Sequence, residues 1–262
     1  MKFRIPYLIF FSAFIQFSCD NLNDSPSSDG PYPPLPAFDV QWNEQNTLVC
    51  FGTSLTYGYG AGEKKFGGPG PIGGIGGIGG NTPSVSNTGD SSYPRFLQEQ
   101  LKITVLNKGY VARTISYALS VVTDSVISKK PALVLVEFGA NDFLQNISAH
   151  TADSLLSLLV TRIQNSGTKV VLLSFINTDM LQYSNGSWSS EDSLLALEYN
   201  SMIKSVASRF AVPLIDYPLK GIFGHPNLMS DGFHPNGAGY KKMEGNIYQA
   251  LIKTFEKNGM VK

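Results

Sequence analysis

Five short, predominantly apolar runs, separated by longer amphipathic stretches, constrain the fold of this chain more than any other feature. The runs are dense in Val, Ile and Leu without polar alternation, which is typical of strands buried on both faces of a parallel sheet. The predicted strands are Thr47–Phe51, Ile103–Leu106, Leu133–Phe138, Lys169–Phe175 and Pro213–Ile215. The predicted helices are Tyr93–Leu101, Ile115–Ser128, Thr151–Asn165, Asp192–Phe210 and Gly237–Lys257. This alternation predicts βαβ units and one α/β sandwich over residues 38–262.

The composition excludes several classes of protein. The chain has 20 basic and 20 acidic residues and 42% hydrophobic residues, so it can bury a core but lacks the basic surplus of a nucleic-acid-binding protein. Two cysteines and three histidines argue against a disulfide scaffold and a His-rich metal site. Cys50 lies in an apolar run and is interpreted as a small buried hydrophobe.

The N-terminus has the pattern of an export signal. Lys2 and Arg4 precede an apolar run that ends at Phe17 and is too short for a final membrane anchor. Ser18 followed by Cys19 resembles a bacterial lipoprotein signal. The resemblance implies a signal peptide at 1–18, lipid on Cys19, a Pro/Ser-rich tether at 19–37 and attachment to a membrane of the bacterial cell envelope. An ordinary secretory signal and a retained membrane anchor are the alternatives.

A glycine-rich segment interrupts the strand–helix pattern. Gly67–Gly80 contains nine Gly in fourteen residues, and glycine at this density loses too much backbone entropy to order itself cheaply. Residues 61–91 are therefore interpreted as a flexible insertion. The segment is either a loop without a role or a lid that borders the substrate site.

Four polar segments carry side chains that could take part in catalysis, and they lie near strand ends or before the last helix. Ser54 follows the first strand, and Asn141 follows the third, with Asn107–Thr114 after the second. Ligands in α/β folds bind where the carboxyl ends of the strands meet. Asp231 and His234 are three residues apart, so one turn can bring the carboxylate to one imidazole nitrogen and leave the other as a base.

These segments, in this chain order, resemble the SGNH or GDSL hydrolase family, in its branch of bacterial esterases, thioesterases and lysophospholipases. The resemblance rests on Gly52–Thr56, Leu135–Asp142 and Ser230–Asn236. It implies a three-layer α/β/α sandwich with a five-stranded parallel sheet, flavodoxin-like, in the order 2-1-3-4-5. It also implies that no metal or cofactor takes part.

The resemblance further implies the roles of individual residues. Ser54 would be the nucleophile, His234 the general base and Asp231 its orienting partner. The oxyanion hole would consist of the Ser54 amide, the Ala112 amide and the Asn141 side chain. The expected activity is hydrolysis of a carboxylic ester or acyl thioester, with a small-molecule or lipid ester as substrate.

Two residues depart from the family pattern. Thr53 stands where the family has Asp, and Ala112 stands where it has Gly. If the site needs a positive φ at position 112, Ala would cost about 1–2 kcal/mol. These departures leave open a non-catalytic binding lipoprotein on a hydrolase scaffold. A sugar O-acyltransferase or deacetylase that uses the same three catalytic residues is a second alternative.

Overall fold

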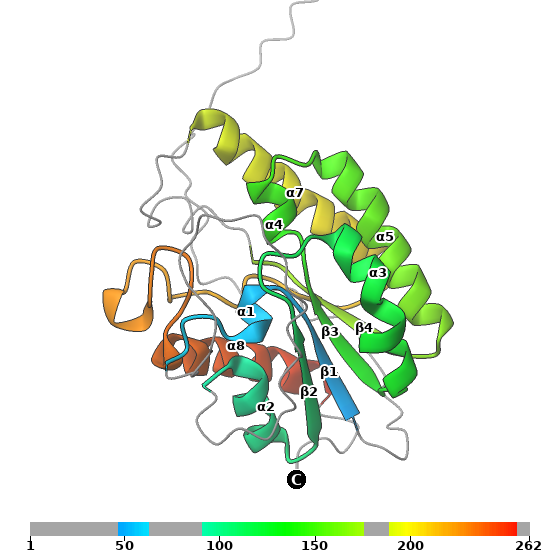
Figure 1. The fold of residues 1–262 in the computed structure, drawn as a ribbon, viewed down its shortest axis with the longest axis horizontal. Coiled ribbons are helices and arrows are strands. Elements are labelled where there is room, and N and C mark those ends of the chain that lie inside the picture. Colours follow the sequence, from blue (N-terminus) through cyan, green and yellow to red (C-terminus); the bar gives the residue numbers. More distant parts are fainter. Residues whose placement is uncertain (1–46, 63–90, 176–188, 256–262) are drawn as a thin grey trace, which may run out of the picture. The chain divides into compact units, whose positions relative to one another are not determined.

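A five-stranded parallel sheet forms the centre of the structure, a computed structural model that describes residues 47–62, 91–175 and 189–255 (Figure 1). The strands pair in the order β2-β1-β3-β4-β5, and every pair is parallel. Their bounds are β1 Thr47–Gly52, β2 Thr104–Gly109, β3 Leu133–Glu137, β4 Lys169–Leu173 and β5 Leu214–Ile215. The predicted α/β fold and its strand order are confirmed.

The two central strands carry the core. Every residue of β1 and β3 is buried, because helices cover both faces of the sheet. Cys50 in β1 lies opposite Leu135 of β3 and Asn107 of β2. Burial raises the pKa of the Cys50 thiol far above its ordinary value, so this side chain packs as an inert hydrophobe, as the sequence predicts.

Helices form a layer on each side of the sheet (Figure 1). Helices α3, α5 and α7 pack side by side on one face, and α2 and α8 pack together on the other. Two shorter helices, α1 and α4, follow β1 and β3 directly. The helix bounds are α1 Ser54–Tyr57, α2 Tyr93–Leu101, α3 Ile115–Ser125, α4 Ala140–Leu144, α5 Ala149–Asn165, α7 Ser190–Arg209 and α8 Gly237–Phe255.

The element bounds differ from the prediction where tertiary pairing or capping overrides local pattern. Strand β2 runs on to Gly109 because β1 continues beside it to Gly52. Helix α3 ends at Ser125, since Val126 leaves helical geometry before the 3-10 turn Ile127–Lys129. Helix α5 begins earlier than predicted because Ser148 accepts a hydrogen bond from the Thr151 amide as its N-cap.

Several predictions fall outside the described residues. They are the signal peptide at 1–18, Cys19, the tether at 19–37 and nearly all of the insertion at 61–91. Within the described ranges, no helix combines the length and apolar character needed to cross a bilayer.

Candidate active site

Ser54 begins helix α1 immediately after β1, so it lies at the carboxyl edge of the sheet. Its hydroxyl oxygen is 3.0 Å from Nε2 of His234, a residue 180 positions later in the chain. His234 lies in the turn before α8, where Asn236 accepts a hydrogen bond from the Gly239 amide and caps that helix. The fold therefore joins, in one hydrogen bond, the two predicted catalytic residues that are farthest apart in the sequence.

Asp231 completes the row from the other side of the imidazole. Its carboxylate oxygens lie 2.9 and 3.1 Å from Nδ1 of His234, and it also accepts the amides of Phe233 and His234 at 2.7 Å. Partial burial alone would raise the pKa of Asp231, but these hydrogen bonds hold it below its ordinary value. An ionised carboxylate places the ring proton on Nδ1 and leaves Nε2 free to accept the Ser54 hydroxyl proton.

The buried carboxylate of Glu137 holds the turn Thr53–Thr56, which carries Ser54. The sequence analysis assigned no role to this residue. Glu137 is 0% exposed at the end of β3. Its carboxylate accepts hydrogen bonds from the amide and the hydroxyl of Thr53, both at 2.9 Å. It also accepts hydrogen bonds from the Thr56 hydroxyl at 2.9 Å and the Thr56 amide at 3.3 Å. Burial raises the pKa of Glu137 to about 7 against the opposing effect of these bonds. An acidic residue inside an apolar parallel strand was the available signal, because such a group must be paired.

Gly52 gives this cluster the space it needs. A Cβ at position 52 would collide with the Thr56 hydroxyl and the Glu137 carboxylate. Thr53, which departs from the family pattern, donates its hydroxyl to Glu137. The departure thus produces a complete hydrogen-bonded cluster rather than a gap.

The loop between β2 and α3 is held from helix α4. Nδ2 of Asn141 donates to the carbonyl of Arg113 at 2.9 Å. The buried Asp142 accepts the Ile115 amide with both oxygens, at 3.0 and 3.2 Å, at the start of α3. Burial raises the pKa of Asp142 to about 6. Sequence analysis gave Asp142 no role, and the structure shows that it fixes the position of this loop.

Ala112 lies in the same loop with a φ of +59°, the left-handed region that disfavours side chains. It is exposed, one residue before the Arg113 carbonyl that Asn141 binds. Within the described part of the chain, the amides of Ala112 and Ser54 have no hydrogen-bond partner. Both amides can therefore donate to an added oxygen atom.

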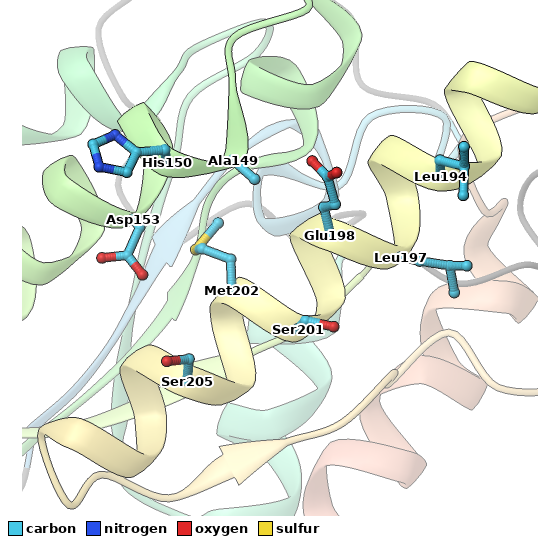
Figure 2. Close-up of a pocket in the computed structure, with 9 residues that line it drawn as sticks. All are labelled: Ala149, His150, Asp153, Leu194, Leu197, Glu198, Ser201, Met202 and Ser205. Carbon is cyan, nitrogen blue, oxygen red and sulfur yellow. The ribbon is translucent and has the colours of Figure 1, made fainter. Parts of the chain in front are cut away.

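A separate groove lies between the start of α5 and helix α7 (Figure 2). It has a volume of about 570 Å³, and Leu194, Leu197 and Met202 line it together with His150 and Asp153. None of the nine residues that line it belongs to the Ser54–His234 row or to the loops around it. The chemistry of the side chains, rather than the size of this groove, locates the candidate active site.

Comparison with known proteins identifies a family for most of the folded chain. The model of the GDSL-like lipase/acylhydrolase family matches residues 50–242. An arylesterase of Vibrio mimicus is 25% identical over 170 residues, which cover 63% of this chain and 80% of that protein. Esterase TesA of Pseudomonas aeruginosa is 25% identical over 158 residues, which cover 60% and 74%.

Solved structures show the same fold. The psychrotrophic esterase EstA of Pseudoalteromonas sp. has a TM-score of 0.61 at 18% identity, and the match covers 81% of this chain and 100% of that one. The family match covers more than half of the chain, and the esterase relatives support hydrolase activity. This chain belongs to the GDSL-like lipase/acylhydrolase family.

Proposed function

We propose that the protein is a serine hydrolase of carboxylic esters or acyl thioesters, with Ser54 as nucleophile, His234 as general base and Asp231 as the orienting carboxylate. The observation that carries the proposal is the 3.0 Å contact between the Ser54 hydroxyl and Nε2 of an imidazole whose Nδ1 faces Asp231. This row supplies an activated hydroxyl near neutral pH without any other group.

In the proposed reaction, the Ser54 oxygen attacks the substrate carbonyl carbon while Nε2 of His234 takes the hydroxyl proton. Asp231 stabilises the resulting imidazolium. The C–O or C–S bond to the leaving group then breaks, and His234 delivers the proton to the departing alcohol or thiol. Water repeats these steps on the acyl-enzyme, releases the carboxylic acid and restores the Ser54 hydroxyl.

Three donors would stabilise the negative charge that develops on the carbonyl oxygen. They are the Ser54 amide, the Ala112 amide and the second Nδ2 hydrogen of Asn141, whose first hydrogen binds the Arg113 carbonyl. Fixed donors aimed at a developing oxyanion are each worth roughly 3–4 kcal/mol in related chemistry. Glu137 and Asp142 support the proposal because they hold the two loops that carry the amides.

The decisive experiment is Ser54→Ala with a short p-nitrophenyl ester as substrate. We expect hydrolysis to fall by at least about 10³-fold with unchanged circular dichroism. Ser120→Ala, an exposed serine on α3, is the matched control and should retain full activity. Comparable hydrolysis by the Ser54 variant and the wild type would remove Ser54 from the mechanism. Loss of fluorophosphonate labelling in Ser54→Ala would locate the reactive hydroxyl directly.

The substrate class needs a panel of esters. We propose a small-molecule or lipid ester, and a chain-length series with a lysophospholipid, an acyl thioester and an acetylated sugar would identify it. Deletion of Gly67–Gly80 separates the two interpretations of the insertion, a lid that borders the substrate site and a loop without a role. A lid predicts a larger change in turnover of long-chain esters than of acetyl esters, and equal effects on both would contradict a lid.

We also propose that the protein is exported and lipidated at Cys19, on the basis of the Lys2 to Cys19 pattern. Expression in a bacterial host with an alkyne-tagged fatty acid should label the membrane fraction of the wild type. Cys19→Ser should lose the label, whereas Cys50→Ala should keep it. Equal labelling of the Cys19 variant and the wild type would contradict lipidation at this residue.

A further inference from the structure

Tyr59 lies against the imidazole of His234 and has no part in the reaction described above. The ring centroids are 4.7 Å apart, with the ring planes inclined at 52°. The side chain is 37% exposed, so burial in the core does not account for its position. Asp231 and Ser54 occupy the two ring nitrogens, and Tyr59 adds a third neighbour to the same imidazole.

The backbone of Tyr59 is hydrogen-bonded to Ser54, in the turn Thr53–Thr56, and to helix α8. Its amide donates to the Ser54 carbonyl at 3.0 Å, and its own carbonyl accepts the hydroxyl of the buried Tyr240 at 2.8 Å. Gly58 and Gly60 on either side have φ values of +83° and +82°, which glycine adopts without strain. The chain thus turns sharply after α1, and this turn places the Tyr59 ring against His234.

The loop of Tyr59 also packs directly on the loop of His234. A Cβ at Gly60 would collide with the Ser230 hydroxyl. Ser230 in turn donates its amide and its hydroxyl to the His234 carbonyl, at 2.8 and 3.1 Å. The backbone that carries each of the two rings, Tyr59 and His234, is therefore held in place by its own hydrogen bonds and by the packing of the two loops.

We propose that Tyr59 is a positioning residue for the general base. Its ring holds the imidazole in line between Asp231 and Ser54 and stabilises the imidazolium that forms when Ser54 attacks. An aromatic ring attracts a cation over its face. In the proposed reaction, His234 is neutral before it takes the Ser54 proton and becomes a cation only as Ser54 attacks. The inference rests on the proposed role of His234 as general base.

This difference between states predicts which kinetic constant changes. An interaction made only when the imidazole is charged lowers the barrier without tightening substrate binding. Loss of the ring should therefore lower kcat and leave KM for a small ester unchanged. A side chain that merely lined the substrate site would change KM instead.

The test compares Tyr59→Phe, which keeps the ring, with Tyr59→Leu, which removes it, using p-nitrophenyl acetate. We expect the Phe variant to stay within about twofold of wild-type kcat and the Leu variant to lose about tenfold, with KM within about twofold for both. Tyr248→Leu, at a half-buried position on α8, is the matched control and should match the wild type. Wild-type kcat in Tyr59→Leu, or an equal loss in Tyr59→Phe, would overturn the proposal.

A readout without turnover separates this inference from the proposed function. The His234 Nδ1 proton, held by Asp231, should give a protected downfield resonance in ¹H NMR of the wild type and Tyr59→Phe. In Tyr59→Leu the signal should broaden through exchange, because the imidazole loses its restraint. An unchanged signal in Tyr59→Leu would reject the positioning role even if no ester were hydrolysed. Failure of the proposed function alone would show as Ser54-independent hydrolysis.

Discussion

The two loops that carry the backbone amides of the candidate site are held in opposite ways. The turn Thr53–Thr56 is almost wholly buried and bonded from within by Glu137, with glycine at position 52, where only glycine fits. The loop that holds Ala112 is exposed and carries a side chain at positive φ. It is bonded at its two ends, by the Tyr110 amide to the Gly52 carbonyl at 2.8 Å and by Asn141 and Asp142 near the start of α3. The turn Thr53–Thr56 is thus fixed by its interior, and the second loop by its two ends.

Glu137→Leu should produce the largest effect on this comparison. It leaves the Thr53 and Thr56 amides buried without an acceptor, which should lower the free energy of unfolding by roughly 3–5 kcal/mol and displace Ser54. Urea denaturation measures the loss. Glu137→Gln is the matched control, since its amide oxygen can still accept both amides. If Glu137→Leu and Glu137→Gln were equally stable, the carboxylate would not hold the turn.

The pH dependence of stability should come next in size. The pKa of Glu137 is about 7 in the folded protein against an ordinary 4.5, so above about pH 4.5 the unfolded chain loses a proton that the folded chain keeps. Stability should therefore fall as pH rises from about 4.5 to 7, by on the order of 3 kcal/mol. Asp142, with a pKa raised from 3.8 to about 6, adds a fall in the window between those values.

Denaturant melts at several pH values would measure this slope. Glu137→Gln should flatten the part of the slope between about pH 6 and 7, because it removes the titrating group. A wild-type stability that rises through this window would contradict the raised pKa of Glu137.

Asp142→Ala should have a smaller effect, confined to the second loop. It removes the acceptor of the Ile115 amide at the start of α3, which should cost roughly 1–2 kcal/mol of stability. Activity should fall while covalent labelling of Ser54 by a fluorophosphonate slows in proportion. Asp142→Asn keeps an acceptor oxygen and serves as control. A large stability loss in Asp142→Asn would show that the charge of Asp142, rather than its hydrogen bond with the Ile115 amide, stabilises the loop.

Ala112→Gly should have the smallest effect, with the opposite sign. Glycine relieves the positive φ of +59°, so thermal melting should show a gain of roughly 0.5–1 kcal/mol. Hydrolysis should be unchanged, since the amide remains. Ala112→Val should instead be destabilised, because a β-branched side chain fits this backbone region poorly. A destabilised Gly variant would contradict strain at this position.

The sequence was sufficient for the features that depend on local pattern. Buried strands such as Leu133–Glu137 have no polar alternation, and the spacing of Asp231 and His234 permits a contact within one turn. It was insufficient for Glu137, Asp142 and Tyr59, whose partners lie between 27 and 175 positions away in the chain. Such contacts depend on how strands and helices pack, so a run of residues does not show them.

The short turn Asp231–His234 concentrates two of the three proposed catalytic side chains in four residues ahead of α8. The proposed nucleophile, Ser54, belongs to the opposite end of the folded chain. Loss of order in this turn alone would therefore abolish proton transfer in the proposed reaction and leave Ser54 in place. A preparation with an intact sheet can then still be catalytically inactive.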